Sequence, residues 1–226
     1  MTAGRRLFWF TIAELSTLVL FGLSYTAFAL GRGDWVAFFQ SPARVGAVVV
    51  SLVLSALVAF TDFGGMNPGK KEDRGNRWIF APLLVLSLAL PVLPAYLDGR
   101  SLWTTDETVT PYVGLALLTL GGTLRLAAVF VLGRRFSGLV AIQEGHRLQT
   151  DGLYRYLRHP SYTGMLLYMA GFVLVFRCWL GLLLVAGTLA ILLARMDAEE
   201  ALLESEFGEE YRSYCRRTCR LVPWVY

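Results

Sequence analysis

Long apolar blocks alternate with short polar segments along the 226 residues of this chain. A membrane-spanning helix needs roughly 20 mostly apolar residues. Four blocks are close to that length: residues 7–30, 43–60, 78–97 and 111–133. The first of them is longer than the apolar region of a cleaved signal peptide, so we expect it to be retained as a span.

A fifth apolar block, residues 161–194, is too long for a single span and is interrupted near its middle by Arg177, Cys178 and Trp179. We interpret it as two short helices folded into a hairpin, with Arg177 at the tip. The pattern therefore predicts an all-α integral membrane protein with about six transmembrane helices, the last two forming that hairpin.

Basic residues are distributed unequally between the two sides that six spans define. The N-terminus, the second and fourth loops and the C-terminal tail together carry 16 Lys and Arg residues, whereas the opposite side carries four. Cytoplasmic loops collect Lys and Arg, so both termini are expected in the cytosol. A single span over residues 161–194 would place the basic fourth loop and the basic tail on opposite sides, which again favours the hairpin.

The composition agrees with a membrane protein and argues against other classes. Hydrophobic residues make up 55% of the chain and charged residues 17%, against about 45–50% and about 25% in soluble domains. Three cysteines and two histidines are too few for a disulfide scaffold or a convincing zinc site, so no metal is expected. The net charge of +4 is explained by the orientation signal and by attraction to anionic membrane lipids, with no nucleic-acid partner expected.

Polar and aromatic residues concentrate in two stretches, 133–162 and 195–226, which flank the hairpin at its two ends. The predicted topology places both in the cytosol, and the hairpin brings them together at the membrane boundary. We therefore expect a functional site where these two stretches meet.

In the first stretch, Asp151-Gly152 predicts a turn, and Pro160 suits the first turn of a helix, where its missing N–H does no harm. His159 directly precedes that helix start, whose free backbone N–H groups can hold an anionic part of a ligand. The plainer alternative is that residues 158–160 only cap an interfacial helix.

The second stretch is predicted to begin as a cytosolic C-terminal helix in which Arg195 and Glu199, four residues apart, share one face. Gly208 would end or break that helix. Two plainer interpretations remain open: a solvated helix with an ordinary ion pair, and a helix lying on the lipid headgroups. The aromatic residues farther along suit a membrane interface; they are Tyr211, Tyr214, Trp224 and Tyr226.

Three sequence elements match one known pattern. They are Leu124-Arg125 with Gly133-Arg134-Arg135-Phe136; His146 and Gly152-Leu153-Tyr154 with Arg158-His159-Pro160-Ser161-Tyr162-Thr163-Gly164; and Arg195, Glu199-Glu200, Phe207-Gly208, Tyr211 and Tyr214. In this combination the chain resembles the isoprenylcysteine carboxyl methyltransferase family of integral membrane methyltransferases. The resemblance extends from about residue 120 to the C-terminus and departs from the family's pattern at residues 217–223, where the family often has a Pro-containing stretch.

The resemblance implies an enzyme that uses S-adenosylmethionine as methyl donor, bound at the cytosolic side of the membrane. It implies an arginine, Arg195, that faces the methyl acceptor. Arg195, Glu199 and His159 are the candidate catalytic residues. The donor contacts that it implies are His146, Arg147, Leu148, Gln149, Tyr154, His159, Pro160, Ser161, Tyr162 and Glu199.

Several acceptors are compatible with these residues. An ionised carboxylate is already a nucleophile and needs no base, and Arg195 is suited to hold it by a charge-assisted fork. A thiol would benefit from deprotonation and an amine would require it, and His159 is the candidate base in both cases. We expect a lipophilic, isoprenylcysteine-like carboxylate; a thiol or lipid amine, or a non-enzymatic scaffold that retains the hairpin, are the alternatives. A small transporter is disfavoured because the polar residues cluster at one face of the membrane.

Two charged residues lie inside predicted spans. Glu14 and Arg125 are each about eight residues, or roughly 12 Å, from the cytosolic end of their span. Charges at that depth usually face the protein interior and pair, so we expect these two to pair or to line the acceptor cavity. Arg125 is therefore a second candidate contact for the acceptor, and its alternative is snorkelling to the interface.

The motifs divide the chain into N-terminal transmembrane helices, residues 1–110, and a methyltransferase core, residues 111–226. Arginine outnumbers lysine by 19 to 2. This usage indicates a G+C-rich genome, so we expect a bacterial or archaeal cytoplasmic membrane rather than the endoplasmic reticulum.

Overall fold

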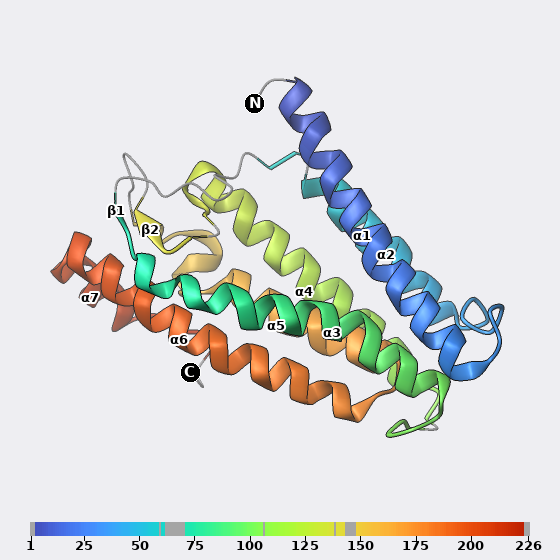
Figure 1. The fold of residues 1–226 in the computed structure, drawn as a ribbon. Coiled ribbons are helices and arrows are strands. Elements are labelled where there is room, and N and C mark those ends of the chain that lie inside the picture. The colour runs from blue at the N-terminus through green and yellow to red at the C-terminus, as the bar shows by residue number, and fades with distance from the viewer. Residues whose placement is uncertain are drawn as a thin grey trace.

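Six apolar helices run back and forth between two ends of the molecule (Figure 1). The computed structural model describes residues 3–58, 60–61, 71–105, 107–137, 139–142 and 148–223. The six helices are α1 (Ala3–Arg32), α2 (Pro42–Val58), α3 (Phe80–Gly99), α4 (Thr110–Leu132), α5 (Pro160–Val175) and α6 (Leu182–Phe207). The remaining elements are short: α7 (Glu209–Cys215), the strands β1 (Lys71–Glu72) and β2 (Ala141–Ile142), and the 3-10 helices Arg74–Ile79, Gly133–Arg135, Gly152–Arg155 and Trp179–Gly181.

Four helical segments among the described residues are long and apolar enough to cross a membrane: Phe10–Arg32, Arg74–Gly99, Thr110–Leu132 and Trp179–Phe207. Two apolar helices are shorter, Pro42–Val58 and Pro160–Val175. The prediction of an all-α membrane fold is therefore confirmed, whereas the number of six spans stays a prediction. The predicted hairpin is present as α5 and α6, which turn at Arg177, a residue with a φ of 53°.

The helix α6 does not stop where the apolar block stops. It continues through Arg195 and Glu199 to Phe207 and ends at Gly208, whose φ of 54° is left-handed. The polar stretch expected as a separate C-terminal helix is thus the last part of α6, and the break predicted at Gly208 is confirmed. The short α7 follows that break.

Helices α4 and α5 approach each other along a row of glycines that we call the glycine seam: Gly114, Gly121, Gly164 and Gly171. A methyl group added at any of these positions would meet backbone atoms of the other helix at less than 3.0 Å. Because Gly has no side chain, the two backbones lie closer than larger residues would permit, as is common between membrane helices. The seam holds α5 against α4 and so determines where the first turn of α5 lies in space.

The connections α1–α2, α3–α4 and α5–α6 meet at the far end of the molecule (Figure 1). There Asp98, which is 1% exposed, forms ion pairs with Arg177 (Nη2–Oδ1 2.6 Å) and Arg44 (Nη2–Oδ2 3.2 Å). The backbone N–H of Trp179 also donates to the carbonyl of Trp103 at 3.0 Å. One buried carboxylate therefore joins α2, α3 and the tip of the hairpin.

The two polar stretches meet at the opposite end. Strand β1 pairs with β2, and the backbone around Arg158 pairs with residues 219–220 of the tail. The main core contains aromatic and aliphatic side chains of the helices α1–α5 and of the connection between α1 and α2, among them Phe28, Phe38, Leu118 and Phe172. This core includes helices from both halves of the chain, and the division at residue 110 stays a prediction.

Candidate active site

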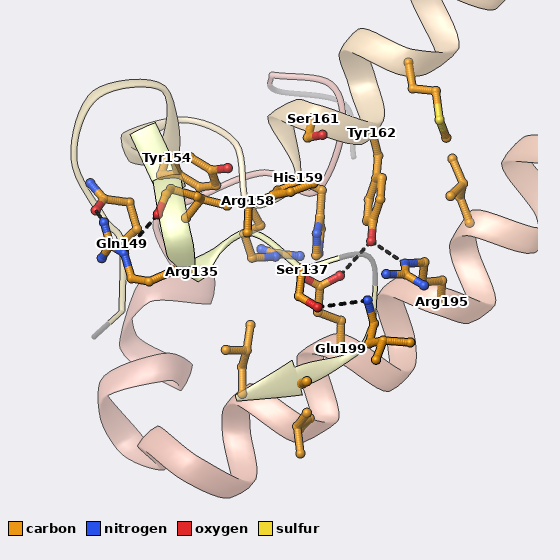
Figure 2. A pocket seen from close by; sticks show the side chains of 18 of the residues that line it. Arg135, Ser137, Gln149, Tyr154, Arg158, His159, Ser161, Tyr162, Arg195 and Glu199 are labelled. Carbon is orange, nitrogen blue, oxygen red and sulfur yellow. Dashed lines mark hydrogen bonds between the residues drawn. The ribbon is translucent and has the colours of Figure 1, made fainter. Parts of the chain in front are cut away.

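The start of α5 places two polar side chains beside α6, those of His159 and Tyr162. Pro160 is the first residue of α5, as predicted, so His159 lies just outside the helix and Tyr162 within its first turn. The Tyr162 hydroxyl accepts a hydrogen bond from Arg195 Nε at 2.6 Å and donates one to Glu199 Oε2 at 2.9 Å. Figure 2 shows this phenol pointing between the two charged side chains of α6. Arg195 and Glu199 do share one face, and a tyrosine hydroxyl bridges them.

A cavity of about 270 Å³ opens at this point and is bounded by α3, α4, α5 and α6. Its size is close to the lower end of the range for small-molecule sites, about 300–1,000 Å³. Polar groups line one part of it: Arg125, Arg135, Arg158, His159, Ser161, Tyr162, Arg195 and Glu199. Apolar side chains line the rest, including Phe80, Leu83, Leu132, Met165 and Leu192. The cavity can therefore receive a ligand with a charged end and an apolar end.

Arg125 enters the cavity from the side of α4. Its Nη1 donates to the carbonyl and to the hydroxyl of Ser161, at 3.3 and 3.2 Å. Glu14 instead accepts a hydrogen bond from Ser55 on α2 at 2.7 Å. The two intramembrane charges therefore do not pair with each other. Arg125 lines the cavity, and its contact with the acceptor stays a prediction.

One carboxylate oxygen behind the cavity receives three donors. Glu200 Oε1 lies 3.0 Å from Arg158 Nε, 3.0 Å from His159 Nε2 and 3.0 Å from Arg220 Nε. We call these four residues the Glu200 cluster. The ring of His159 also stacks on Tyr162, with centroids 5.4 Å apart and planes 20° apart. His159 is thus held between a carboxylate and an aromatic ring.

Two buried tyrosines, Tyr154 and Tyr214, line the cavity and connect its wall to the surrounding backbone. Tyr214 Oη donates to the carbonyl of Tyr154 at 2.7 Å, and Tyr154 Oη donates to the carbonyl of Ala128. Burial, followed by the nearby charge of Glu199, raises the pKa of Tyr154 far above its usual range. Burial likewise raises the pKa of Tyr214. Both phenols therefore remain neutral hydrogen-bond donors at physiological pH.

A family model, "Isoprenylcysteine carboxyl methyltransferase (ICMT) family", matches residues 114–205. This range begins within α4 and ends near the end of α6, and it contains the hairpin and most of the cavity-lining residues. Over this range the chain is similar to the isoprenylcysteine carboxyl methyltransferase family.

Curated relatives of the family agree with this match. A protein named protein-S-isoprenylcysteine O-methyltransferase B from Arabidopsis thaliana is 35% identical over 50% of this chain and 58% of its own length. A probable protein-S-isoprenylcysteine O-methyltransferase from Oryza sativa subsp. indica is 35% identical over 50% of this chain and 61% of its length. The chain thus spans less than two thirds of these two relatives.

A longer match joins the chain to a protein-S-isoprenylcysteine O-methyltransferase from Xenopus laevis, 28% identical over 89% of this chain and 72% of that protein. A solved eukaryotic intramembrane Ras methyltransferase of the family is 21% identical over 98% of this chain and 94% of that one, with a TM-score of 0.44. The named relatives are eukaryotic, which conflicts with the expectation of a bacterial or archaeal membrane drawn from arginine usage.

The structure brings most of the predicted site residues together around the cavity. Leu148, Gln149, Tyr154, His159, Ser161, Tyr162, Arg195, Glu199 and Arg125 line it, and Pro160 begins the helix beside it. His146 and Arg147 lie outside the described residues.

Sequence reasoning missed the parts of the site that depend on long-range contacts. Arg135 lines the cavity and donates to Gln149 Oε1 at 2.9 Å. Tyr211 and Tyr214 were assigned to a membrane interface, but both are 3% exposed and line the cavity. Their spacing of three residues places both on one face of a helix, but it does not distinguish a buried face from one at a membrane interface.

Proposed function

We propose that this protein is an integral membrane methyltransferase that transfers a methyl group from S-adenosylmethionine to a lipophilic, isoprenylcysteine-like carboxylate. The relatives of residues 114–205 are named protein-S-isoprenylcysteine O-methyltransferases. The observation that carries the proposal is the bridge from Arg195 through the Tyr162 hydroxyl to Glu199 at the edge of a part-apolar cavity. It places one cationic and one anionic group where two substrates of opposite charge can meet.

The proposed membrane arrangement has six spans with both termini and the cavity on the cytosolic side. The shorter helices α2 and α5, of 17 and 16 residues, are each about 25 Å long, which is somewhat less than a hydrocarbon core of about 30 Å. Two of the four arginines on the far side, Arg44 and Arg177, are paired with Asp98. This pairing partly neutralises the few basic residues of the far side.

The residues of the cavity fit S-adenosylmethionine in their chemistry. The donor combines a sulfonium cation, a zwitterionic amino acid and an adenosine, so it needs a carboxylate, aromatic surface and donors for its own carboxylate. Glu199 supplies the first, and Tyr154 and Tyr162 supply neutral aromatic rings that favour cations. Arg158 and the first turn of α5 supply donors. Leu148, Gln149 and His159–Tyr162 complete the proposed donor contacts.

On the acceptor side, Arg195 and Arg125 would hold the carboxylate. When bound, S-adenosylmethionine supplies an electrophilic methyl group, and an ionised carboxylate attacks such a group without a general base. The chain's task is therefore alignment and removal of water. Tyr162 fixes the Arg195 guanidinium through its Nε, and the apolar lining from Leu83 and Leu192 keeps water from the acceptor.

The contacts of His159 bear on the alternative acceptors. A thiol or an amine would call for a base, but His159 Nε2 is directed at Glu200 and the ring is 5% exposed. This placement favours a structural task for the imidazole and an acceptor that is already ionised. A carboxylate acceptor meets that condition at neutral pH, because its ordinary pKa is about 4.

Donor binding separates an enzyme from a non-enzymatic scaffold with the same hairpin. We expect the protein in detergent to bind S-adenosylhomocysteine in calorimetry, and Glu199→Gln to weaken binding by about tenfold or more, since a charge-assisted contact is lost. Glu204→Gln, five residues farther along α6 in an exposed pair with Arg212, is the matched control. No binding by the unmodified protein would indicate a scaffold.

The product identifies the acceptor. Membranes that contain the protein would be supplied with donor carrying a labelled methyl group, and labelled molecules would be analysed by mass spectrometry. We expect a methyl ester that mild base hydrolyses. A base-stable thioether or N-methyl product would contradict the carboxylate proposal.

A further inference from the structure

We propose that Glu200 is a positioning residue for donor binding, which holds His159 and the C-terminal tail in place at the donor end of the cavity. The inference rests on the proposed methyltransferase function and deepens it. Glu200 is not among the residues that line the cavity, but two members of the Glu200 cluster, Arg158 and His159, are. Its influence on the site therefore passes through them.

Three cationic or potentially cationic side chains converge on one carboxylate. Arg158 and His159 come from the segment before α5, Arg220 comes from the tail, and all three lie 3.0 Å from the same oxygen of Glu200. The side chains are 15%, 4% and 12% exposed, and that of Glu200 is 19% exposed. Arg220 also pairs with Asp197 at 2.5 Å. Without the Glu200 carboxylate, Arg158 would lose its counter-ion beside Arg220 in a poorly hydrated place, where charges interact strongly.

The backbone shows what the carboxylate holds together. Arg158 N–H donates to the carbonyl of Cys219 at 2.8 Å, His159 N–H donates to that of Arg220 at 3.1 Å, and Cys219 N–H donates to that of Tyr156 at 3.0 Å. Arg158 Nη1 adds bonds to the carbonyls of Thr218 and Cys215. The tail thus lies beside the segment that precedes α5. Glu200 on α6 is hydrogen-bonded to side chains from both of these segments.

His159 transmits this arrangement to the reactive end of the cavity. Its ring stacks on Tyr162, whose hydroxyl bridges Arg195 and Glu199. If the bond to Glu200 is lost, the imidazole is free to rotate, and the stacked phenol loses the neighbour that fixes its plane. The expected consequence is a poorly formed donor site in a protein that is still folded.

The test uses Glu200→Gln, which keeps the shape of the side chain and removes its charge, with Glu204→Gln as the control on the same helix. In detergent, without donor, we expect amide hydrogen exchange at residues 158, 159 and 219 to become about tenfold faster or more in Glu200→Gln and to stay unchanged in Glu204→Gln. In the assay, we expect the KM for S-adenosylmethionine to rise about tenfold, with smaller changes in kcat and in the acceptor KM.

A second variant keeps the inference testable if Glu200→Gln does not fold. Arg220→Gln removes the ion pair between Arg220 and Glu200. It is expected to accelerate amide hydrogen exchange at residue 219 more than at residue 158. Unchanged exchange in Glu200→Gln, or a lower kcat with an unchanged donor KM, would overturn the inference. If the unmodified protein bound no donor, the proposed function and the donor part of this inference would both fail, whereas the exchange rates would still report whether Glu200 holds the tail.

Discussion

At the scale of single residues, the site depends on a hydroxyl group placed between two opposite charges. Tyr162 accepts from Arg195 and donates to Glu199, so its single oxygen sets the distance between the cationic and anionic sides of the cavity. The sequence placed these three residues in the site through the resemblance to the family. It did not predict the bridge, because a hydrogen bond between residues more than 30 positions apart depends on how α5 and α6 pack.

Removal of that hydroxyl tests its importance directly. We expect Tyr162→Phe to lower kcat/KM by about tenfold to a hundredfold, because two charge-assisted hydrogen bonds are lost while the ring remains. The control is Tyr168→Phe on the same helix, which removes a bond of 2.8 Å to Ser51 away from the cavity. That variant is expected to lose about 1 kcal/mol of stability and to keep its activity. Equal activities in the two variants would show that the bridge is dispensable.

At the scale of elements, the hairpin is held less by its own two arms than by the glycine seam between α4 and α5. The sequence predicted the hairpin from an apolar block of excessive length, and it predicted both the start of α5 at Pro160 and the break at Gly208. The packing partner of α5 was not predicted, because a glycine in an apolar block carries no hydrophobic signal. The spacing of seven residues within each helix, at 114 and 121 and at 164 and 171, is the recognisable trace of the seam.

The seam can be tested with one methyl group. We expect Gly121→Ala to destabilise the protein by about 1–3 kcal/mol, the usual effect of overpacking, because the added carbon would meet the backbone of Tyr168 and Gly164 at less than 3.0 Å. Gly22→Ala is the control, since no atom lies within 4 Å of the added carbon on α1. Thermal unfolding in detergent would compare the two, and a Gly121→Ala protein as stable as the control would contradict the close approach.

At the scale of the whole molecule, one buried carboxylate holds the far end together. Asp98 joins α2, α3 and the hairpin tip through Arg44 and Arg177. The charge count of the sequence treated those arginines only as residues on the less basic side. Their shared partner could not be predicted, because it lies on a different helix, α3.

Asp98→Asn is expected to destabilise the protein by about 3–5 kcal/mol, because it leaves two arginines without their buried counter-ion. Glu204→Gln, in an exposed pair with Arg212, is expected to change stability by less than about 1 kcal/mol. Denaturant or thermal unfolding of both variants in the same detergent is the measurement. A small effect at Asp98 would show that water solvates the cluster at the far end.

The sidedness of the molecule is tested by single cysteines. In a parent in which Cys215 and Cys219 are replaced by serine, Trp103→Cys marks the far end and Arg155→Cys marks the cavity end; both positions are exposed. We expect a membrane-impermeant maleimide added to intact cells to label Trp103→Cys, and to label Arg155→Cys only after lysis. The parent measures the background from buried Cys178, and the reverse pattern would contradict cytosolic termini.

The glycine seam has a consequence for how this protein could change its choice of substrate. The seam reaches Gly164, three positions after Ser161, and on the other helix it ends beside Arg125, whose guanidinium contacts Ser161. The close approach of the two helices at this end of the seam thus sets how far Ser161 on α5 lies from Arg125 on α4 at the wall of the cavity. Substitutions that adapt the protein to larger or smaller substrates are therefore expected in the glycine seam, whose residues contact neither the donor nor the acceptor.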